Sequence, residues 1–356
     1  MMLFCARLSV FMNLLQKHRN LYPPRYFKLL VQLCICFLLQ GLIKREDKFY
    51  QDHMQSIEFT DDPVFITGHW RSGTTYLHYL MALDKDNFAY PTNYQCLFPT
   101  IFLTVNESSW RYKLLDRVMG TRTRHIDNME LTLTSPQEEE WMYLPEGGFS
   151  YIFESLRFPQ TSVSNFDEII RLSNDELTKE ITLKIFRKLT FAHNKRILSK
   201  SPGHFSRIRL LKEIFPTSKF IFLVRNPYDV VISMVHMKNI LRKRLSFQKY
   251  YPDDVTSVAN FLSFYHNTVK NSLDTLNPHD YIFLKYENLT NQPTKYLQEI
   301  YGSFKFQYTD KYEKSLLAYL ETVKDYKRNQ FELTAEVRDT IYRECPQVFH
   351  DYGYER

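Results

Sequence analysis

"FITGHWRSGTTYLHYLM" (residues 65–81) joins a short apolar run, a turn of small and polar residues, and an apolar segment with helical spacing. Gly68 and Gly73 are five positions apart, as in the loop that binds the phosphates of nucleoside triphosphates. Thr74 stands where that loop has a lysine, and without the lysine a triphosphate loses its principal cation. The stretch therefore predicts a strand, an anion-binding turn and a helix, in a site that does not bind ATP.

The turn keeps other groups that bind anions. Backbone N–H groups at the helix N-terminus remain, together with three hydroxyl side chains and one cation, namely Ser72, Thr74, Thr75 and Arg71. These groups suit a compact anion at a 5′ position. The alternative interpretation is that the two glycines only make a tight turn between a strand and a helix.

The same order of strand, turn and amphipathic helix recurs along the chain. We expect strands at residues 64–67, 196–200, 220–224 and 281–285. Nearly continuous apolar strands that alternate with helices are typical of a parallel sheet covered on both faces, and ligands bind at the carboxyl ends of such strands. The sequence therefore predicts an α/β fold with a site at one sheet edge, where three segments meet: Gly68–Thr75, Lys200–Ser201 and Arg225–Asn226.

Two helices have clear start signals after their strands. Ser201 and Asn226 are suited to cap a helix N-terminus, and each is followed by a proline, which is favoured in the first turn. We expect one helix to run from Pro202 to about Phe215 and another to begin at Pro227.

Arg225 and Ser233 suggest a second anion site. Arg225 ends the third strand, and Ser233 lies eight positions later, about two turns into the next helix. Both side chains could converge on a second phosphate, which suits a nucleotide with phosphates on different carbons. The alternative is an ordinary surface arginine and an ordinary helix serine.

Composition limits the class of protein. The chain of 356 residues is 44% hydrophobic, no linker or repeat divides it, and its net charge of +6 is scattered, which fits an anionic small ligand better than nucleic acid. Five cysteines without a CxxC pair indicate a reduced, cytoplasmic setting and no structural zinc. We expect an N-terminal helical extension at residues 1–55 and a single catalytic or binding domain at residues 56–356.

Residues 26–43 raise the question of a membrane. The apolar run at residues 29–43 is shorter than the roughly 20 residues that span a bilayer, and basic residues flank it on both sides. Three interpretations stay open: a helix packed on the domain, a helix lying on a membrane surface in peripheral contact, and a true anchor.

Several segments resemble the sulfotransferases that use 3′-phosphoadenosine 5′-phosphosulfate (PAPS). "PVFITGHWRSGTTYLHYLM" is similar to their 5′-phosphosulfate loop, and "FIFLVRNPYDVVISM" is similar to their 3′-phosphate motif, including the spacing of eight between arginine and serine. "LSKSPGHFSRIRLLKEIFPTSKFIF" and "LKYENLTNQPTKYLQEIY" resemble later blocks of the family, and the likeness to the bacterial-type branch covers roughly residues 60 to 305. The resemblance implies a P-loop-like parallel sheet flanked by helices, with a helical C-terminal region.

The resemblance also implies roles for single residues. Arg71, Ser72, Gly73, Thr74 and Thr75 correspond to the loop that binds the 5′-phosphate, with Arg71 as its cation. Arg225 and Ser233 correspond to the 3′-phosphate site, and Lys200 to a lysine that assists the leaving group. A basic C-terminal segment, Lys327, Arg328 and Asn329, resembles the loop that reaches the 3′-phosphate in cytosolic relatives. No metal is implied.

The general base is harder to assign. Related proteins often place a glutamate where Gln95 stands here, and a carboxamide cannot accept the proton. Glu138, Glu139 and Glu140 follow a predicted helix start, and repulsion among them or burial of one favours proton uptake. We prefer Glu138 or Glu140 as the base over the other candidates, Asp127 and His204; the alternative is a solvated helix N-terminus. His69, His78 and His125 are interpreted as packing or surface residues.

The acceptor is only broadly indicated. Many aromatic residues between Tyr90 and Phe158 could line an apolar acceptor pocket, although core packing explains at least half of them. Together with the apolar N-terminal segment they suggest a hydroxyl, or an amine, on a lipid-like molecule. Two other classes of function stay open: a P-loop nucleotide kinase, and a nucleotide-binding protein without turnover.

Overall fold

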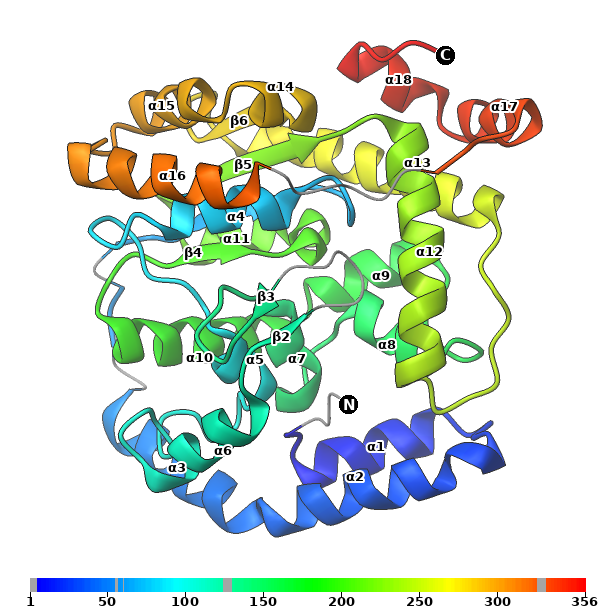
Figure 1. Cartoon of the computed structure of the whole chain (residues 1–356). Coiled ribbons are helices and arrows are strands. Elements are labelled where there is room, and N and C mark those ends of the chain that lie inside the picture. The colour runs from blue at the N-terminus through cyan, green and yellow to red at the C-terminus, as the bar shows by residue number, and fades with distance from the viewer. Residues whose placement is uncertain (1–4, 55–56, 60, 124–129, 325–330) are drawn as a thin grey trace. The chain divides into compact units, whose positions relative to one another are not determined.

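The computed structural model describes residues 5–54, 57–59, 61–123, 130–324 and 331–356 (Figure 1). The chain divides into two compact units, which are described separately. The first unit combines residues 1–60, 91–194 and 240–251, and the second combines residues 61–90, 195–239 and 252–356. The expected boundary after residue 55 stays a prediction.

The second unit is built on a parallel sheet of four strands in the order β4-β1-β5-β6. The strands are β1 (Val64–Thr67), β4 (Leu198–Lys200), β5 (Lys219–Val224) and β6 (Tyr281–Lys285). The register is fixed by pairs such as Ile66 with Lys200 and with Ile221. All four predicted strands and their parallel pairing are confirmed, although β4 begins two residues later than we expected.

Side chains on the two faces of this sheet alternate, as the strand repeat requires. On one face Val64, Ile66 and Ile221 pack in a core cluster with α4 (Thr74–Ala82), α14 (Tyr286–Asn291), α15 (Pro293–Phe304) and α16 (Asp310–Val323). On the other face Phe65 and Phe220 stack with ring centroids 5.1 Å apart, and Phe65 also contacts Phe215. The sheet is therefore covered on both faces, as predicted.

The helix starts after β4 and β5 follow the predicted caps. Ser201 Oγ accepts the N–H of Gly203 at 3.1 Å, and Asn226 Oδ1 accepts the N–H of Tyr228 at 3.0 Å. The segment after Ser201 differs from the single helix we expected: it is a 3₁₀ turn, η2 (Pro202–Ser206), followed by α11 (Ile208–Ile214). Gly203 explains the difference in part, because glycine is a weak helix former.

The other elements between residues 227 and 352 that have not yet been named are helical. They are α12 (Pro227–Leu245), α13 (Val255–Ser272), η3 (Leu273–Thr275), α17 (Ala335–Glu344) and α18 (Pro346–Tyr352).

Helices make up most of the first unit. They are α1 (Leu8–Lys17), η1 (Pro23–Arg25), α2 (Tyr26–Leu38), α3 (Gln40–His53), α5 (Asn93–Leu97), α6 (Trp110–Met119), α7 (Glu140–Glu146), α8 (Tyr151–Arg157), α9 (Phe166–Ser173) and α10 (Glu176–His193). A short antiparallel pair accompanies them, β2 (Arg122–Thr123) with β3 (Glu130–Leu131).

Buried ion pairs connect α3, α7 and α10 with the chain before α1. Lys188 Nζ lies 2.8 Å from Glu46 Oε1, and Glu146 Oε2 lies 2.9 Å from both Lys184 Nζ and an Arg7 guanidinium nitrogen. Burial by itself raises the pKa of Glu146, but the charges of Lys188, Lys184 and Arg7 outweigh it and lower the pKa to about 2. Ion pairs thus hold α3 and the chain before α1 against α7 and α10, and protonation of Glu146 would break those in which it takes part.

The apolar N-terminal segment is not one continuous helix. Helix α2 ends at Leu38, α3 begins at Gln40, and the two are bent by 48°. Gln40 Nε2 donates to the carbonyl of Cys36, and Gly41 weakens helix continuation. Among the described residues no single helix has the length and apolar content to cross a membrane. Only when the bent pair Pro23–Leu38 and Gln40–His53 is taken together are the length and the apolar content sufficient.

Candidate active site

The turn between β1 and α4 requires glycine at two positions. A Cβ at Gly68 would lie 2.3 Å from the carbonyl oxygen of Leu223, a distance that real Cβ atoms do not reach. Gly73 has φ +96°, and a Cβ there would lie 2.2 Å from the ring of Tyr286. The spacing of these glycines thus reflects close approach of neighbouring chain at one end of the turn and a left-handed backbone at the other.

Arg71 connects this turn with α12. Its backbone adopts φ 75°, which is uncommon for a residue other than glycine and is found preferentially at functional sites. Its Nε donates to Ser233 Oγ at 2.9 Å, and its carbonyl oxygen accepts a bond from Arg225 Nη1 at 3.2 Å. The turn and the predicted second anion site are therefore in direct contact.

Polar side chains are buried around the N-terminus of α4. Ser72 and Thr74 are buried, and Ser72 Oγ has no hydrogen-bond partner within the described ranges. Lys200, at the end of β4, is only 1% exposed, and its Nζ lies 3.4 Å from Thr75 Oγ1. Burying a hydroxyl without a partner is costly, and an anion bound beside Ser72 and the N-terminus of α4 would offset that cost.

The sequence interpretation missed the residues that follow β6. The ring of Tyr286 covers Gly73, and the guanidinium of Arg225 lies 4.8 Å from the centroid of the same ring. Glu287 Oε1 accepts the N–H of Asn226 at 3.1 Å, and its Oε2 accepts the hydroxyl of Tyr354 at 2.8 Å. The rule that sites gather at the carboxyl ends of parallel strands could have indicated both positions.

Arg225 is held by more than one contact. Its Nη2 donates to Asp229 Oδ2 at 2.9 Å, one helical turn along α12. Together with Tyr286 and the carbonyl of Arg71, this fixes the guanidinium beside the turn. The eight residues Arg71, Ser72, Gly73, Thr74, Thr75, Lys200, Arg225 and Ser233 all belong to the second unit. Arg328, with Lys327 and Asn329, lies outside the described residues.

The candidate bases belong mainly to the first unit. Glu139 and Glu140 are buried at the start of α7, and Glu138 is half-buried, so these acids do not form a solvated helix end. Gln95 instead completes a capping box with Thr92 at the start of α5. His125 and Asp127 lie outside the described residues.

Three other histidines considered from the sequence, His69, His78 and His204, are buried. Burial lowers the pKa of His69 to about 4, and its Nδ1 lies 2.8 Å from the carbonyl of Trp70. Nε2 of His78 lies 3.3 Å from the carbonyl of Leu198, and Nε2 of His204 lies 2.9 Å from Ser199 Oγ. Within the part of the chain that the structure describes, no group of three or more His, Cys, Asp or Glu side chains is placed to hold a metal ion.

Several aromatic residues expected near an acceptor pack in the core of the first unit. The rings of Tyr94 and Tyr112 meet edge-on with centroids 4.7 Å apart, and the ring centroids of Phe153 and Trp141 are 4.1 Å apart. Tyr94, Tyr143 and Phe153 are buried. The aromatic content of this region is thus explained largely by packing.

A glycine turn without lysine, at the carboxyl edge of a parallel sheet and before a helix N-terminus, defines a P-loop-like phosphate-binding class. Residues 63–310 match the family model described as the Sulfotransferase family, and the chain belongs to this family. It is therefore an enzyme that transfers a sulfuryl group, in a family whose co-substrate is PAPS. This assignment replaces the two alternatives, a P-loop nucleotide kinase and a nucleotide-binding protein without turnover.

Related proteins agree with this assignment. The chain is 31% identical over 303 residues to the omega-hydroxy-beta-dihydromenaquinone-9 sulfotransferase Stf3 of Mycobacterium tuberculosis and of Mycobacterium bovis, an alignment that covers 83% of this chain and 76% of that protein. Two crystal structures share the fold. Sulfotransferase STF9 from Mycobacterium avium has a TM-score of 0.69 at 16% identity over 99% of this chain and 98% of that chain. Sulfotransferase STF1 from Mycobacterium tuberculosis has a TM-score of 0.63 at 18% identity over 94% and 90%.

Proposed function

We propose that the chain binds PAPS with its 5′-phosphosulfate against the turn at residues 68–75. The supporting observations are the tight turn that Gly68 and Gly73 allow before α4, the buried Ser72 hydroxyl without a partner among the described residues, and the buried cation Lys200. Backbone N–H groups at the N-terminus of α4 add a favourable dipole for the anion. Thr74 and Thr75 supply further hydroxyl donors.

We propose that Arg225 and Ser233 bind the 3′-phosphate of the same nucleotide. The observation that carries this proposal is the chain of contacts from Arg225 to the carbonyl of Arg71 and from the Arg71 side chain to Ser233. These contacts support the proposal because they join cations from the ends of two strands. Arg328, predicted to reach the same phosphate, stays a prediction.

The transfer needs little more than positioning and charge. PAPS supplies the sulfuryl group: its bond to the bridging oxygen of the nucleotide breaks while a bond to the acceptor hydroxyl oxygen forms. We assign Lys200 and Arg71 to stabilise the negative charge left on the nucleotide. The acceptor proton passes to a base, for which Glu138 and Glu140 stay our candidates.

The acceptor we propose is a hydroxyl on a lipid-like molecule. Stf3, the relative at 31% identity, is named for omega-hydroxy-beta-dihydromenaquinone-9, and a hydroxyl on such an isoprenoid quinone is the first acceptor to test. We place the protein in the cytoplasm because none of its five cysteines, all of which lie within the described residues, forms a disulfide. Membrane contact through residues 26–43 stays a prediction, which the exposed side of α2 supports.

A thermal-shift titration tests donor binding. A ligand that binds only the native state at a hundredfold excess over its Kd stabilises the protein by about 2.7 kcal/mol. We expect stabilisation by 3′,5′-adenosine diphosphate and much less by AMP, ATP or GTP. Arg225→Ala should weaken this affinity roughly tenfold to a hundredfold, because charge-assisted hydrogen bonds to the phosphate are lost.

Arg209→Ala is the matched control. Arg209 also belongs to the second unit, but it is exposed and pairs with Asp274 at 3.1 Å, so its loss should leave the titration unchanged. Equal stabilisation by ATP, or an unchanged affinity in Arg225→Ala, would contradict the proposed donor site.

Acceptor class is tested separately with PAPS labelled in the sulfuryl group. We expect label to enter a whole lipid extract and not a delipidated cell extract. Equal transfer to both would contradict a lipid-like acceptor while leaving the donor site intact. Glu138→Gln and Glu140→Gln then identify the base: its loss should lower kcat roughly 10²-fold to 10⁴-fold and flatten the acid limb of the pH profile.

A further inference from the structure

Helix α2 carries an apolar side that faces solvent. Its residues recur at helical spacing on one face, and among them Phe27 is 78% exposed and Leu38 is 76% exposed. On the opposite side Gln32 and Cys36 are buried. The exposed set consists of Phe27, Leu30, Cys34, Phe37 and Leu38.

Contacts within the first unit hold α2 in this orientation. Arg25 Nη2 donates to the carbonyl of Lys243 at 2.8 Å, and Lys28 Nζ donates to the carbonyl of Arg244. Lys28 also lies 5.5 Å from the centroid of the Phe247 ring. The basic side chains at the start of α2 therefore bind the protein, and the apolar side is presented outward.

Helix α6, in the same unit, repeats this arrangement. Trp110, Leu114 and Val118 lie four positions apart and are all exposed, whereas Tyr112 on the opposite side is buried. Three exposed basic residues flank the apolar row, namely Arg111, Lys113 and Arg117. Helices α2, α3 and α6 lie at the same end of this unit, the lower end in Figure 1.

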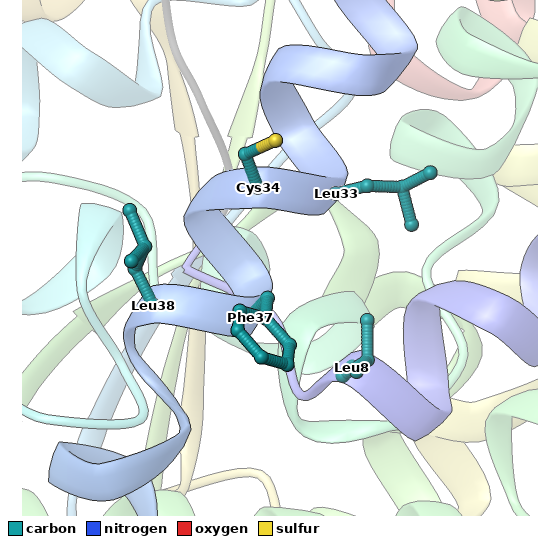
Figure 2. A pocket seen from close by; sticks show the side chains of 5 residues that line it. All are labelled: Leu8, Leu33, Cys34, Phe37 and Leu38. Carbon is teal, nitrogen blue, oxygen red and sulfur yellow. The ribbon is translucent and has the colours of Figure 1, made fainter.

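An open pocket lies between α1 and α2. Figure 2 shows its lining: Leu33, Cys34, Phe37 and Leu38 of α2, with Leu8 of α1 opposite the Phe37 ring. Its volume is about 410 Å³. Hydrocarbon and one thiol line the pocket, a surface suited to an alkyl chain and not to a polar ligand.

The charge around these helices selects one kind of partner. Exposed Lys44, Arg45 and Lys48 on α3 add to the basic side chains of α6. Apolar rows with aromatic residues and flanking cations are typical of helices that lie in the interface of an anionic membrane. The 13 residues of α2 extend only about 20 Å, so this helix is suited to lie along a bilayer and not to cross it.

We propose that the exposed residues of α2 and α6 form a docking face that binds the surface of an anionic lipid bilayer. Phe27, Leu30, Phe37, Trp110, Leu114 and Val118 enter the interface, the basic residues of α3 and α6 contact lipid phosphates, and the pocket beside Phe37 takes one lipid chain. The purpose of docking rests on the proposed lipid-like acceptor, but the binding itself requires neither donor nor acceptor.

Vesicle sedimentation of the full chain tests the docking face. We expect binding to vesicles of phosphatidylcholine mixed with an equal part of phosphatidylglycerol, weaker binding to phosphatidylcholine alone, and weaker binding at high salt. Phe27→Ser and Leu30→Ser should each lower the partition coefficient at least roughly tenfold, because each removes an apolar side chain from the interface. Because both residues are exposed, the melting temperatures of the two variants should equal that of the unchanged protein.

Leu177→Ser is the matched control, because Leu177 is 51% exposed on α10 of the same unit, comparable with Leu30 at 57%. It should bind vesicles as the unchanged protein does. Binding that is unaffected in the two α2 variants, or that falls equally in Leu177→Ser, overturns the proposal. A dimer that dissociates in the α2 variants, together with no vesicle binding, would overturn it in favour of a second copy of this chain.

Fluorescence gives an independent measurement. Lipids with a quencher in the acyl chain should quench Trp110, and the quenching should be lost in Trp110→Phe. Undiminished quenching in this variant would contradict insertion of α6. Titration of the α2 variants with 3′,5′-adenosine diphosphate separates the two proposals: docking can fail while nucleotide binding persists, and the donor site can fail while vesicles are still bound.

Discussion

The turn at residues 68–75 and helix α2 depart from ordinary packing in opposite directions. Around the turn, polar and charged groups such as Ser72 and Lys200 are buried, whereas α2 leaves Phe27 and Leu38 exposed to solvent. Burial of polar groups and exposure of a contiguous apolar surface are both unfavourable in the absence of a partner. The comparison supports both proposals: an anion bound at the turn, where Ser72 Oγ is buried without a partner among the described residues, and hydrocarbon bound at the helix.

The largest expected effect concerns Lys200. If its buried charge stabilises the departing nucleotide, Lys200→Met should lower kcat between roughly a hundredfold and a thousandfold, as loss of one preorganised donor does in other enzymes. Affinity for 3′,5′-adenosine diphosphate, measured by thermal shift, should change much less. Lys311→Met is the control, since Lys311 is exposed and pairs with Asp86 at 2.8 Å. An unchanged kcat in Lys200→Met would mean that the lysine only packs.

A second expected effect is the pH dependence of stability in the first unit, where Glu146 is buried. The pKa of Glu146 is lowered to about 2 in the folded chain from a usual value of 4.5, so its pairing stabilises the fold fully above about pH 4.5. This stability should be lost as the pH falls from about 4.5 to about 2, by on the order of 3 kcal/mol. Urea unfolding at a series of pH values measures the loss.

Glu146→Gln isolates this contribution. The variant should be less stable at neutral pH, because Lys184, Lys188 and Arg7 lose a buried partner, and its stability should depend less on pH within the same window. If the variant and the unchanged chain lose stability in parallel below pH 4.5, other carboxylates are responsible for the pH dependence.

The smallest expected effect concerns Tyr286, whose ring lies against Gly73 and Arg225, two residues of the proposed donor site. Tyr286→Leu removes the ring under Arg225 and should weaken binding of 3′,5′-adenosine diphosphate roughly threefold to thirtyfold, because a cation–π contact contributes about 0.5–2 kcal/mol. Tyr286→Phe keeps the ring and should retain the affinity. Equal loss in both variants would show that the hydroxyl matters instead.

Much of the second unit could be predicted from the sequence because its signals are local. Strands β1, β5 and β6 are nearly continuous apolar runs, and the caps at Ser201 and Asn226 are read from neighbouring residues. The sequence also placed the turn and Arg225 at one sheet edge, but it did not predict the bond from Arg71 to Ser233. Roles in catalysis stay predictions for all of these residues.

Other features depend on neighbours that the local sequence does not specify. Tyr286 reaches Gly73 and Arg225 only because of the order of the strands in the sheet, which no single motif encodes. The break between α2 and α3 follows from a side-chain bond of Gln40 that competes with the helix. Burial of Glu139 and Glu140 likewise results from tertiary packing of α7, so the sequence left open whether these acids are buried or solvated.

The distribution of thiols gives the protein a ready attachment point for a spectroscopic label. All five cysteines lie within the described residues, and among them only Cys34 is exposed, at the open pocket on the outer side of α2. Burial raises the pKa of Cys5 and of Cys345 to about 12 and also raises that of Cys36, so these thiols react slowly near neutral pH. A nitroxide reagent should therefore modify the natural sequence at a single place, and its paramagnetic resonance would record immersion depth without prior removal of any cysteine.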